Sequence, residues 1–281
     1  MYSFARKPIW LAGHALAAGL LVTFVIAGFW QLSRHNEVSD RNALVAERID
    51  MRPLDAERFF EAVADPESID ELEFRTVMLP VARFHGDGAV LIRNRSLEGV
   101  SGCHFAIPAE VPSSDNSEPV GVLAVAGWLP SQTCEEMLVD EPDRLLVVRT
   151  PLAAATRFEG RIRRSQERGW LGPADPAQGR LESMARVDVE RINRQTDLDL
   201  VPMYVEVIHF ANPDGSKIEP RRVAAEGAPV LEFIPPPELD AGPHLGYTFQ
   251  WFSFAAVAIV GYTLVLRHQA RKGDSEQIAD D

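Results

Sequence analysis

The sequence predicts a membrane protein of the α+β class, in which two transmembrane helices bracket an external antiparallel β-sheet or barrel domain with a few helices. Residues 8–33 and 241–266 carry no formal charge, and each stretch exceeds the roughly 20 residues that cross a bilayer core. In lipid the backbone must satisfy its own hydrogen bonds, so each stretch is expected to be helical. The segment between them contains short apolar runs bounded by Gly, Pro, Asn or Ser, a pattern typical of strands.

The first apolar stretch has two other interpretations, and the residues argue against both. The apolar core of a cleaved signal peptide is only about 7 to 15 residues long, whereas this run continues into Phe29-Trp30-Gln31-Leu32. A buried core helix is the second alternative. A soluble protein would then place its two most apolar stretches at opposite chain ends, each beside basic residues. We therefore interpret residues 9–32 as an uncleaved anchor.

Basic residues at both ends of the chain predict its orientation. Arg6 and Lys7 precede the first stretch, and Arg267, Arg271 and Lys272 follow the second. Because positive residues stay on the cytoplasmic side, both termini are expected there, in the cell inner membrane, with the main domain on the periplasmic or outer side. The predicted divisions are a cytoplasmic tail 1–8, transmembrane helix 9–32, external domain 33–243, transmembrane helix 244–266 and cytoplasmic tail 267–281.

The interior segment supplies the expected strands and helices. Strands are predicted over residues 75–84, 89–94, 103–111, 120–127, 145–150 and 202–210. The run from Val120 to Ala126 has no polar side, which favours the middle of the sheet. Asp55 and Asp188 are natural helix N-caps, the first followed by Phe59 and Val63, the second by Val189 and Ile192. Residues 113–118 are predicted to form a hairpin loop and residues 169–179 a longer surface loop.

Composition excludes some functions and leaves others open. A net charge of -13 among 281 residues argues against a nucleic-acid partner, which would require a basic stripe, and it suits a domain that stays soluble beside an anionic membrane. The two apolar stretches make membrane lipid an expected partner. Cys103 and Cys134 lack the spacing of a zinc site. They are either a disulfide or buried thiols. No nucleophile elbow, phosphate loop, dinucleotide fingerprint or zinc-protease motif is found, so no enzymatic activity is expected.

Several motifs follow one another in an order that resembles a known family. They are Gly28-Phe-Trp-Gln-Leu-Ser-Arg34, the strand pair within 74–96, Gly99 to Pro108, Val122 to Pro130 with its Gly-Trp-Leu-Pro ending, Arg157 to Arg163, Pro202 to Val205, and His244-Leu-Gly-Tyr247-Thr-Phe-Gln-Trp251-Phe. Together they resemble the Surf-one (Surfeit-locus-one, Shy-type) family. Ala126 departs from the pattern, because the family usually has Arg at that position.

The resemblance implies an assembly factor for haem-copper cytochrome oxidase that acts on the maturation of subunit I. The implied partners are subunit I and other oxidase assembly factors. The implied cofactor is haem a, held transiently through His244, whose imidazole is a suitable axial ligand. As an alternative without the family, His244 is an interfacial residue at the start of the second helix.

Three more residues are candidates for cofactor binding. Arg34 lies where a haem propionate would sit, and a charge-assisted hydrogen bond would suit that carboxylate; otherwise Arg34 anchors the helix end. Tyr247 and Trp251 offer apolar contact to a porphyrin, or act as interfacial anchors. His35 is either a second ligand or solvated, and His14 is expected to support helix packing.

A membrane-anchored sensor or ligand-binding protein with no oxidase role is the alternative function. Such a sensor needs a cytoplasmic output domain, and the sequence offers only short tails on that side. An assembly factor needs neither an output domain nor a catalytic constellation, and is therefore the favoured prediction.

Overall fold

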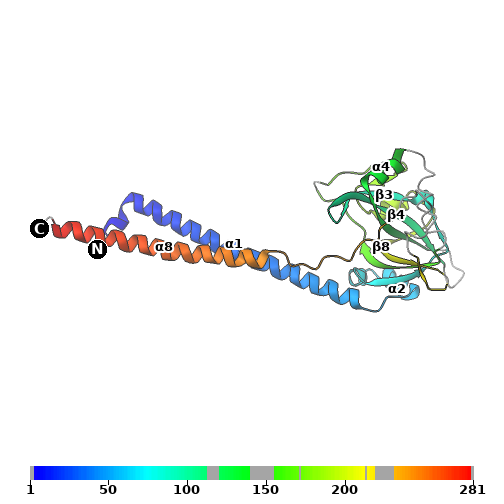
Figure 1. The fold of residues 1–281 in the computed structure, drawn as a ribbon, viewed down its shortest axis with the longest axis horizontal. Coiled ribbons are helices and arrows are strands. Elements are labelled where there is room, and N and C mark those ends of the chain that lie inside the picture. Colours follow the sequence, from blue (N-terminus) through cyan, green and yellow to red (C-terminus); the bar gives the residue numbers. More distant parts are fainter. Residues whose placement is uncertain are drawn as a thin grey trace. The chain divides into compact units, whose positions relative to one another are not determined.

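The computed structural model describes residues 3–112, 120–139, 155–170, 172–212, 214–218 and 231–279. The chain divides into two compact units, one made of residues 1–46 and 238–281 and the other of residues 47–237 (Figure 1). The first is a pair of helices and the second is a β-sheet with helices. They are described separately below.

The helical unit consists mainly of α1 (Pro8–Asp50) and α8 (His244–Ala279), preceded by the short helix η1 (Ser3–Arg6). Both long helices have the length and composition to cross a membrane, and only 0% and 6% of their most apolar windows are buried. A core helix of a soluble protein would instead bury such residues. The outward apolar surfaces are compatible with membrane anchoring.

Aromatic side chains and one glycine pack α1 against α8. A Cβ atom at Gly28 would lie 2.8 Å from Cε1 of Phe252, so only glycine lets that ring approach. The rings of Phe29 and Phe252 are 5.3 Å apart, and those of Phe24 and Trp251 are 5.8 Å apart. A small residue facing a large one is the usual way for apolar helices to approach closely.

The helix that contains the first apolar stretch is longer than that stretch, because α1 continues to Asp50. Residues 33–50 contain neither Gly nor Pro, and the helix ends three residues before Pro53, which disfavours helical geometry in the residue before it. The membrane limits 9–32 and 244–266 stay predictions. The sheet unit comprises residues 47–237, within the predicted external segment 33–243.

The sheet unit contains nine strands among the residues that the structure describes. They are β1 (Thr76–Pro80), β2 (Arg83–Phe84), β3 (Val90–Leu97), β4 (Val100–Val111), β5 (Val120–Pro130), β6 (Arg157–Arg164), β7 (Ser183–Met184), β8 (Leu200–Ala211) and β9 (Lys217–Ile218). The helices are α2 (Ala56–Ala64), α3 (Ile69–Leu72), η2 (Gly86–Gly88), α4 (Ser131–Val139) and α6 (Val189–Asn193).

The strand order is β1-β6-β8-β5-β4-β3-β7, with β2 also paired to β4 and β9 to β8. Only Val81 and Ala82 separate β1 from β2. The segment 76–84 therefore pairs first with β6 and then with β4, which joins the two ends of the path β6-β8-β5-β4. These pairings have the connectivity of a closed barrel.

The sheet is mixed, so the prediction of a purely antiparallel sheet is wrong. The pairs β5–β8 and β3–β7 are parallel. Parallel pairing requires a long crossover connection. The connection from β5 to β8 contains α4, β6, β7 and α6. The predicted central place of Val120–Ala126 is confirmed, because β5 lies between β4 and β8. The predicted strand 145–150 and loop 113–118 lie outside the described residues.

Apolar residues fill both faces of this sheet. One cluster includes Phe59, Phe105, Phe158 and Val205; the other includes Ile92, Leu123, Ile192 and Tyr204. The two predicted helices are confirmed: the Asp55 carboxylate accepts a hydrogen bond from the Arg58 backbone N–H, and Asp188 accepts one from that of Arg191. Phe59, Val63, Val189 and Ile192 are buried, so each cap precedes a helix that packs on the sheet.

Cys103 and Cys134 form a disulfide, with 2.09 Å between the sulfur atoms. Cys103 lies in β4 and Cys134 in α4, so the bond ties this helix to the sheet. Of the two alternatives that the sequence left open, the structure has the disulfide.

Replacing both cysteines by alanine should lower the free energy of unfolding by about 3 kcal/mol, because the disulfide closes a loop with a sequence separation of 31 residues. Guanidinium denaturation of the purified chain measures this. Reductant should produce a similar loss in the wild type and no further loss in the variant. Alkylation of both thiols in unreduced wild-type protein would contradict the disulfide.

Candidate functional site

The start of α8 and the middle of α1 meet through one hydrogen bond between side chains. Nδ1 of His244 lies 2.8 Å from Oε1 of Gln31. The amide oxygen is an acceptor, so Nδ1 is the donor in this contact. A metal-ligating histidine is commonly oriented by such a bond from one ring nitrogen while the other faces the metal.

The backbone turns just before His244. Gly242 has a φ of +69°, and its N–H donates to the Asp240 carboxylate at 2.9 Å. Glycine suits this left-handed conformation. A Cβ at Gly242 would lie 3.7 Å from Nε2 of His244, which is an ordinary contact distance.

Arg34 lies one helical turn beyond Gln31 on the same face of α1, since residues three apart are neighbours on a helix. Its Nη1 is 3.0 Å from Oε2 of Glu37, and the two side chains are 53% and 60% exposed. Exposed pairs of this kind contribute about 0–1 kcal/mol. The guanidinium is therefore available to a stronger anionic partner.

The other predicted site residues are placed differently. Tyr247 lies one turn into α8 and is 48% exposed. The Trp251 ring instead contacts Phe24, at 5.8 Å, and Phe254, at 5.9 Å, so it joins the helices. Of the two histidines in α1, His35 has a buried Nδ1 with no hydrogen-bond partner in the described structure, which differs from a solvated side chain. His14 bonds to Tyr262, as expected for helix packing.

Sequence reasoning did not select Gln31 as a site residue. It belongs to the motif Gly28-Phe-Trp-Gln-Leu-Ser-Arg34, from which Arg34 was the predicted site residue. The spacing of three residues between Gln31 and Arg34 was the available signal, because it places both on one helix face. Its hydrogen-bond partner on the other helix, His244, could be identified only from the structure.

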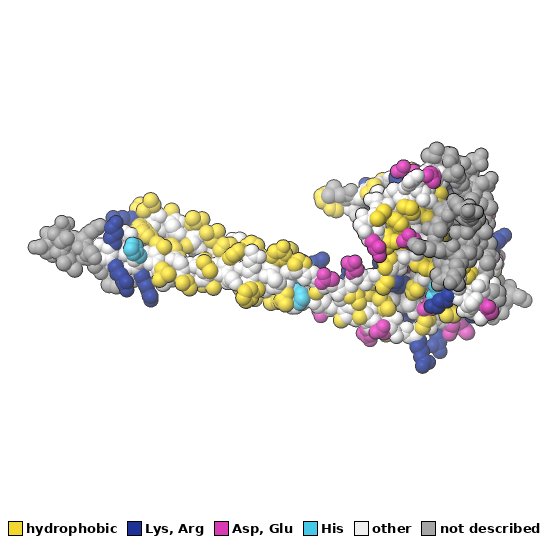
Figure 2. All heavy atoms as spheres, viewed as in Figure 1, with side chains coloured by type: hydrophobic (Ala, Val, Ile, Leu, Met, Phe, Trp, Pro, Cys, Tyr) yellow, Lys and Arg dark blue, Asp and Glu magenta, His cyan; other side chains and the backbone are white. Residues whose placement is uncertain are grey.

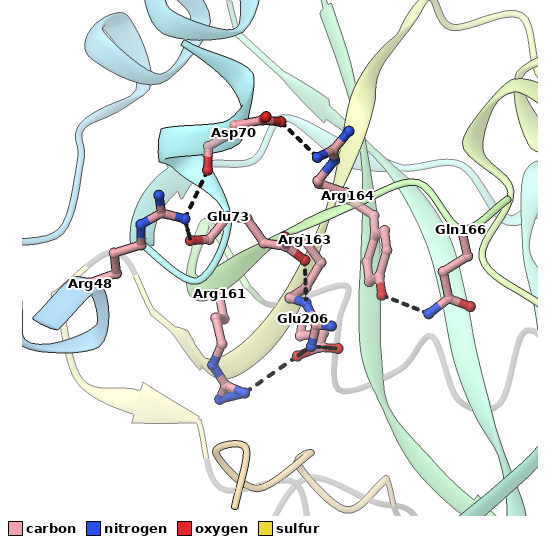
Figure 3. Close-up of polar contacts among 9 residues, drawn as sticks. Arg48, Asp70, Glu73, Arg161, Arg163, Arg164, Gln166 and Glu206 are labelled. Carbon is pink, nitrogen blue, oxygen red and sulfur yellow. Dashed lines mark hydrogen bonds and ion pairs between the residues drawn. The ribbon is translucent and has the colours of Figure 1, made fainter. Parts of the chain in front are cut away.

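A second polar cluster lies in the sheet unit around Glu206 of β8 (Figure 3). Its carboxylate is 3.3 Å from Nη1 of Arg161 and 3.1 Å from Nη1 of Arg163, both from β6. The Arg161 and Glu206 side chains are only 4% and 9% exposed. A buried carboxylate requires such partners, because an isolated charge away from water is very unfavourable.

The Glu206 cluster reaches both ends of the sheet unit. Arg161 donates to the Pro235 carbonyl at 3.3 Å, and Arg163 lies 3.7 Å from Glu73. Arg48 donates to the backbone carbonyls of Asp70 and Glu73, at 2.8 and 3.0 Å. These contacts connect the segment that enters the sheet unit with the segment that leaves it.

The pKa values of two side chains, Tyr204 and His104, lie far from 7. Burial, with the charge of Glu206, raises the pKa of Tyr204 to about 12. Burial, with the positive charge of Arg95, lowers the pKa of His104 to about 4. Both side chains are therefore neutral near pH 7, and neither has the pKa near the operating pH that favours a general acid or base.

Metal-ligating side chains do not gather in threes in the described parts of the chain. A lone histidine cannot enclose a bare ion, since protein metal sites typically use three or four ligands. A tetrapyrrole brings its own ring nitrogens to the metal, so a single histidine can serve as the protein's ligand.

The chain has an apolar helix before and after a mixed β-sheet unit in the sequence. This organisation is compatible with a membrane-anchored protein. Comparison with protein families matches residues 18–256 to the SURF1 family. The chain belongs to the SURF1 family, which is associated with cytochrome oxidase assembly. None of the curated proteins matches the chain.

Ala126, the departure from the family motif, is fully buried in the cluster that contains Phe105 and Phe158. The small side chain is therefore part of the apolar core here. This chain has no cation at that position.

Substituting Glu206 by Gln should lower the free energy of unfolding by about 3 kcal/mol, because it leaves Arg161 and Arg163 without their buried counter-charge. Chemical denaturation of the full chain in detergent measures the loss. Asp70→Asn is the matched control, since the Asp70–Arg164 pair is exposed and should contribute less than about 1 kcal/mol. Equal losses in both variants would contradict this assignment.

Proposed function

We propose that the protein is a membrane-anchored assembly factor that assists the maturation of cytochrome oxidase subunit I by holding haem a for transfer. The proposal rests on the hydrogen bond from His244 to Gln31, which orients an imidazole for axial ligation. Family membership supports the oxidase as the target. Subunit I and other oxidase assembly factors are the proposed partners.

His244 would bind the haem iron through Nε2. Metal-bound histidines almost always donate their other ring N–H to an acceptor that fixes the ring and its tautomer, and Gln31 is such an acceptor. Haem a itself would supply the redox-active iron that the oxidase uses. The protein's part is to bind and orient this group.

Arg34 and Tyr247 would complete the site from two helices. Arg34 would exchange its exposed partner Glu37 for a haem propionate, with which it can form two parallel hydrogen bonds. The exposed Tyr247 ring offers apolar contact one turn from His244. Trp251, packed against Phe24, would contribute by holding the two helices in register rather than by covering the porphyrin.

We further propose that the protein acts without catalysing a reaction. Holding a cofactor for delivery requires a ligand, a counter-charge for the propionate and apolar contact. His244, Arg34 and Tyr247 provide these three elements, and none of them needs a general acid or base.

The proposed orientation places the sheet unit outside the cytoplasm, with both termini inside. The basic residues that flank the two apolar stretches support it. The Cys103–Cys134 disulfide is a second support, because such bonds persist mainly in oxidising compartments such as the periplasm.

Reporter fusions test this orientation. A reporter active only outside the cytoplasm should work when inserted after Gly99, in the exposed turn between β3 and β4, and should be silent after Lys272. The reciprocal cytoplasmic reporter should give the opposite pattern. Activity of the external reporter after Lys272 would exclude two crossings with both termini inside.

Substituting His244 by Ala should lower bound haem a at least tenfold in cells that make it, and lower assembled oxidase in a strain lacking the native copy. Gln31→Leu should cause a loss of about tenfold, the lower end of the range for groups that orient a metal ligand. His268→Ala, an exposed histidine elsewhere on α8, is the matched control and should change neither quantity.

The readouts are the Soret absorbance per purified protein and the oxidase activity of membranes. His244→Ala protein that inserts normally and keeps an unaltered Soret band would reject His244 as the ligand. Unchanged oxidase in the deletion strain, with no second copy of the gene, would reject the assembly role.

A further inference from the structure

A cavity of about 260 Å³ lies between α1 and α8, away from His244 and toward the end that carries both chain termini. It is lined by His14, Ala17, Ala18, Leu21, Ala258, Ile259, Tyr262 and Thr263. Its volume falls below the roughly 300–1,000 Å³ of typical small-molecule pockets. A narrow, flexible apolar occupant suits this space better than a folded ring system.

The cavity exists because small residues face each other across the helix pair. Ala17 and Ala18 of α1 and Ala258 of α8 line it, and Tyr262 is the aromatic residue of the lining. At one end His14 hydrogen-bonds Tyr262 with Nδ1, and its Nε2 lies 3.2 Å from the Ala5 carbonyl.

The polar groups of the lining are already paired. Besides the His14–Tyr262 bond, the Thr263 hydroxyl donates to the Ile259 carbonyl at 2.7 Å. A water molecule needs two to four polar partners to occupy a cavity, and this lining offers it few. A hydrocarbon chain makes no hydrogen bonds and therefore needs no polar partners in such a cavity.

Cations surround the same end of the helix pair. Figure 2 shows basic side chains gathered at the end of the pair that carries the termini. Arg6 and Lys7 precede α1, and Arg267, Arg271 and Lys272 lie in α8. The sequence has no Asp or Glu before Glu37 and none between Asp240 and Asp274, so these five cations, here called the collar, are the formal charges nearest to the apolar spans on this side.

The collar and the cavity are close along the helix axes. At 1.5 Å per residue, Lys7 lies about 10 Å from His14, and Arg267 lies about 8 Å from Tyr262. A molecule that joins an anionic group to a hydrocarbon chain through a short backbone can reach both places.

We propose that the helix pair binds an anionic phospholipid, with its phosphate among Arg6, Lys7 and Arg267 and one acyl chain in the cavity. Basic pockets between transmembrane helices are suited to such head groups. The cations favour a lipid over a partner helix as the occupant, because an anionic head group is complementary to them. The inference rests on the proposed membrane insertion of α1 and α8.

The test compares phosphatidylglycerol with phosphatidylcholine of identical acyl chains, added to the full-length protein purified from membranes in mild detergent. Native mass spectrometry measures the fraction of protein that retains each lipid. The wild type should retain phosphatidylglycerol at least tenfold better. Substituting Arg6, Lys7 and Arg267 by Gln should remove this preference, because each cation is expected to raise the affinity for the anionic lipid about fivefold.

Ala258→Phe fills the cavity and should abolish retention of phosphatidylglycerol. Ala256→Phe is the matched control, since Ala256 is exposed on α8 and does not line the cavity. Should Ala258→Phe fail to fold, the charge variant still decides, because its side chains lie outside the packed interface.

Equal retention of the two lipids, or wild-type retention by Ala258→Phe, would overturn the inference. So would a dimer that Ala258→Phe converts to monomer without any lipid dependence, since a second copy would then fill the cavity. Failure of the anchoring itself would appear differently, as wild-type protein missing from the membrane fraction.

Discussion

The Glu206 carboxylate is the constraint on which the sheet unit depends. Once β8 buries this charge, two arginines must lie beside it, and β6 supplies them from alternate positions of one face. Their remaining donors and charges then engage Pro235 and Glu73, and Arg48 reaches the same region. Replacing such a network by apolar residues often costs little stability. The arrangement is therefore better explained by where it holds the two chain segments than by the energy it contributes.

The two halves of the helical unit differ in how closely α1 and α8 pack. Toward His244, Gly28 admits the Phe252 ring, and Phe24 meets Trp251, so the helices are closely packed. Close packing there gives the Gln31–His244 bond a fixed geometry, which the proposed haem ligation by His244 would require. In the other half alanines leave space between the helices. One pair of helices thus offers a rigid surface at one end and an apolar recess at the other.

Much of the fold could be predicted from residues that are close together in the sequence. The caps at Asp55 and Asp188, the central place of β5 and the two apolar helices follow from residues adjacent in sequence, and all are found. The parallel pairing of β5 with β8 was missed, although a strand without a polar side is typical of parallel sheets, because register and direction depend on distant residues. For the same reason neither Gln31 nor Glu206 was selected: each acquires its role from a partner far away in the chain. The length of α1 beyond Leu32 did not follow from composition, because composition reports the surroundings of a segment, whereas helix ends follow Gly, Pro and capping residues.

The β5–β8 pairing also sets an order of events during synthesis. Gly121 pairs with Leu200, so β5 has no partner on that edge until almost the entire sheet unit has been made. β5 is buried along nearly its whole length, and an apolar strand with an open edge is prone to pair with other chains. Soon after β8 emerges, α8 begins at His244. The barrel can therefore close only after β8 has been made, when little of the chain before the second apolar helix remains to be synthesised.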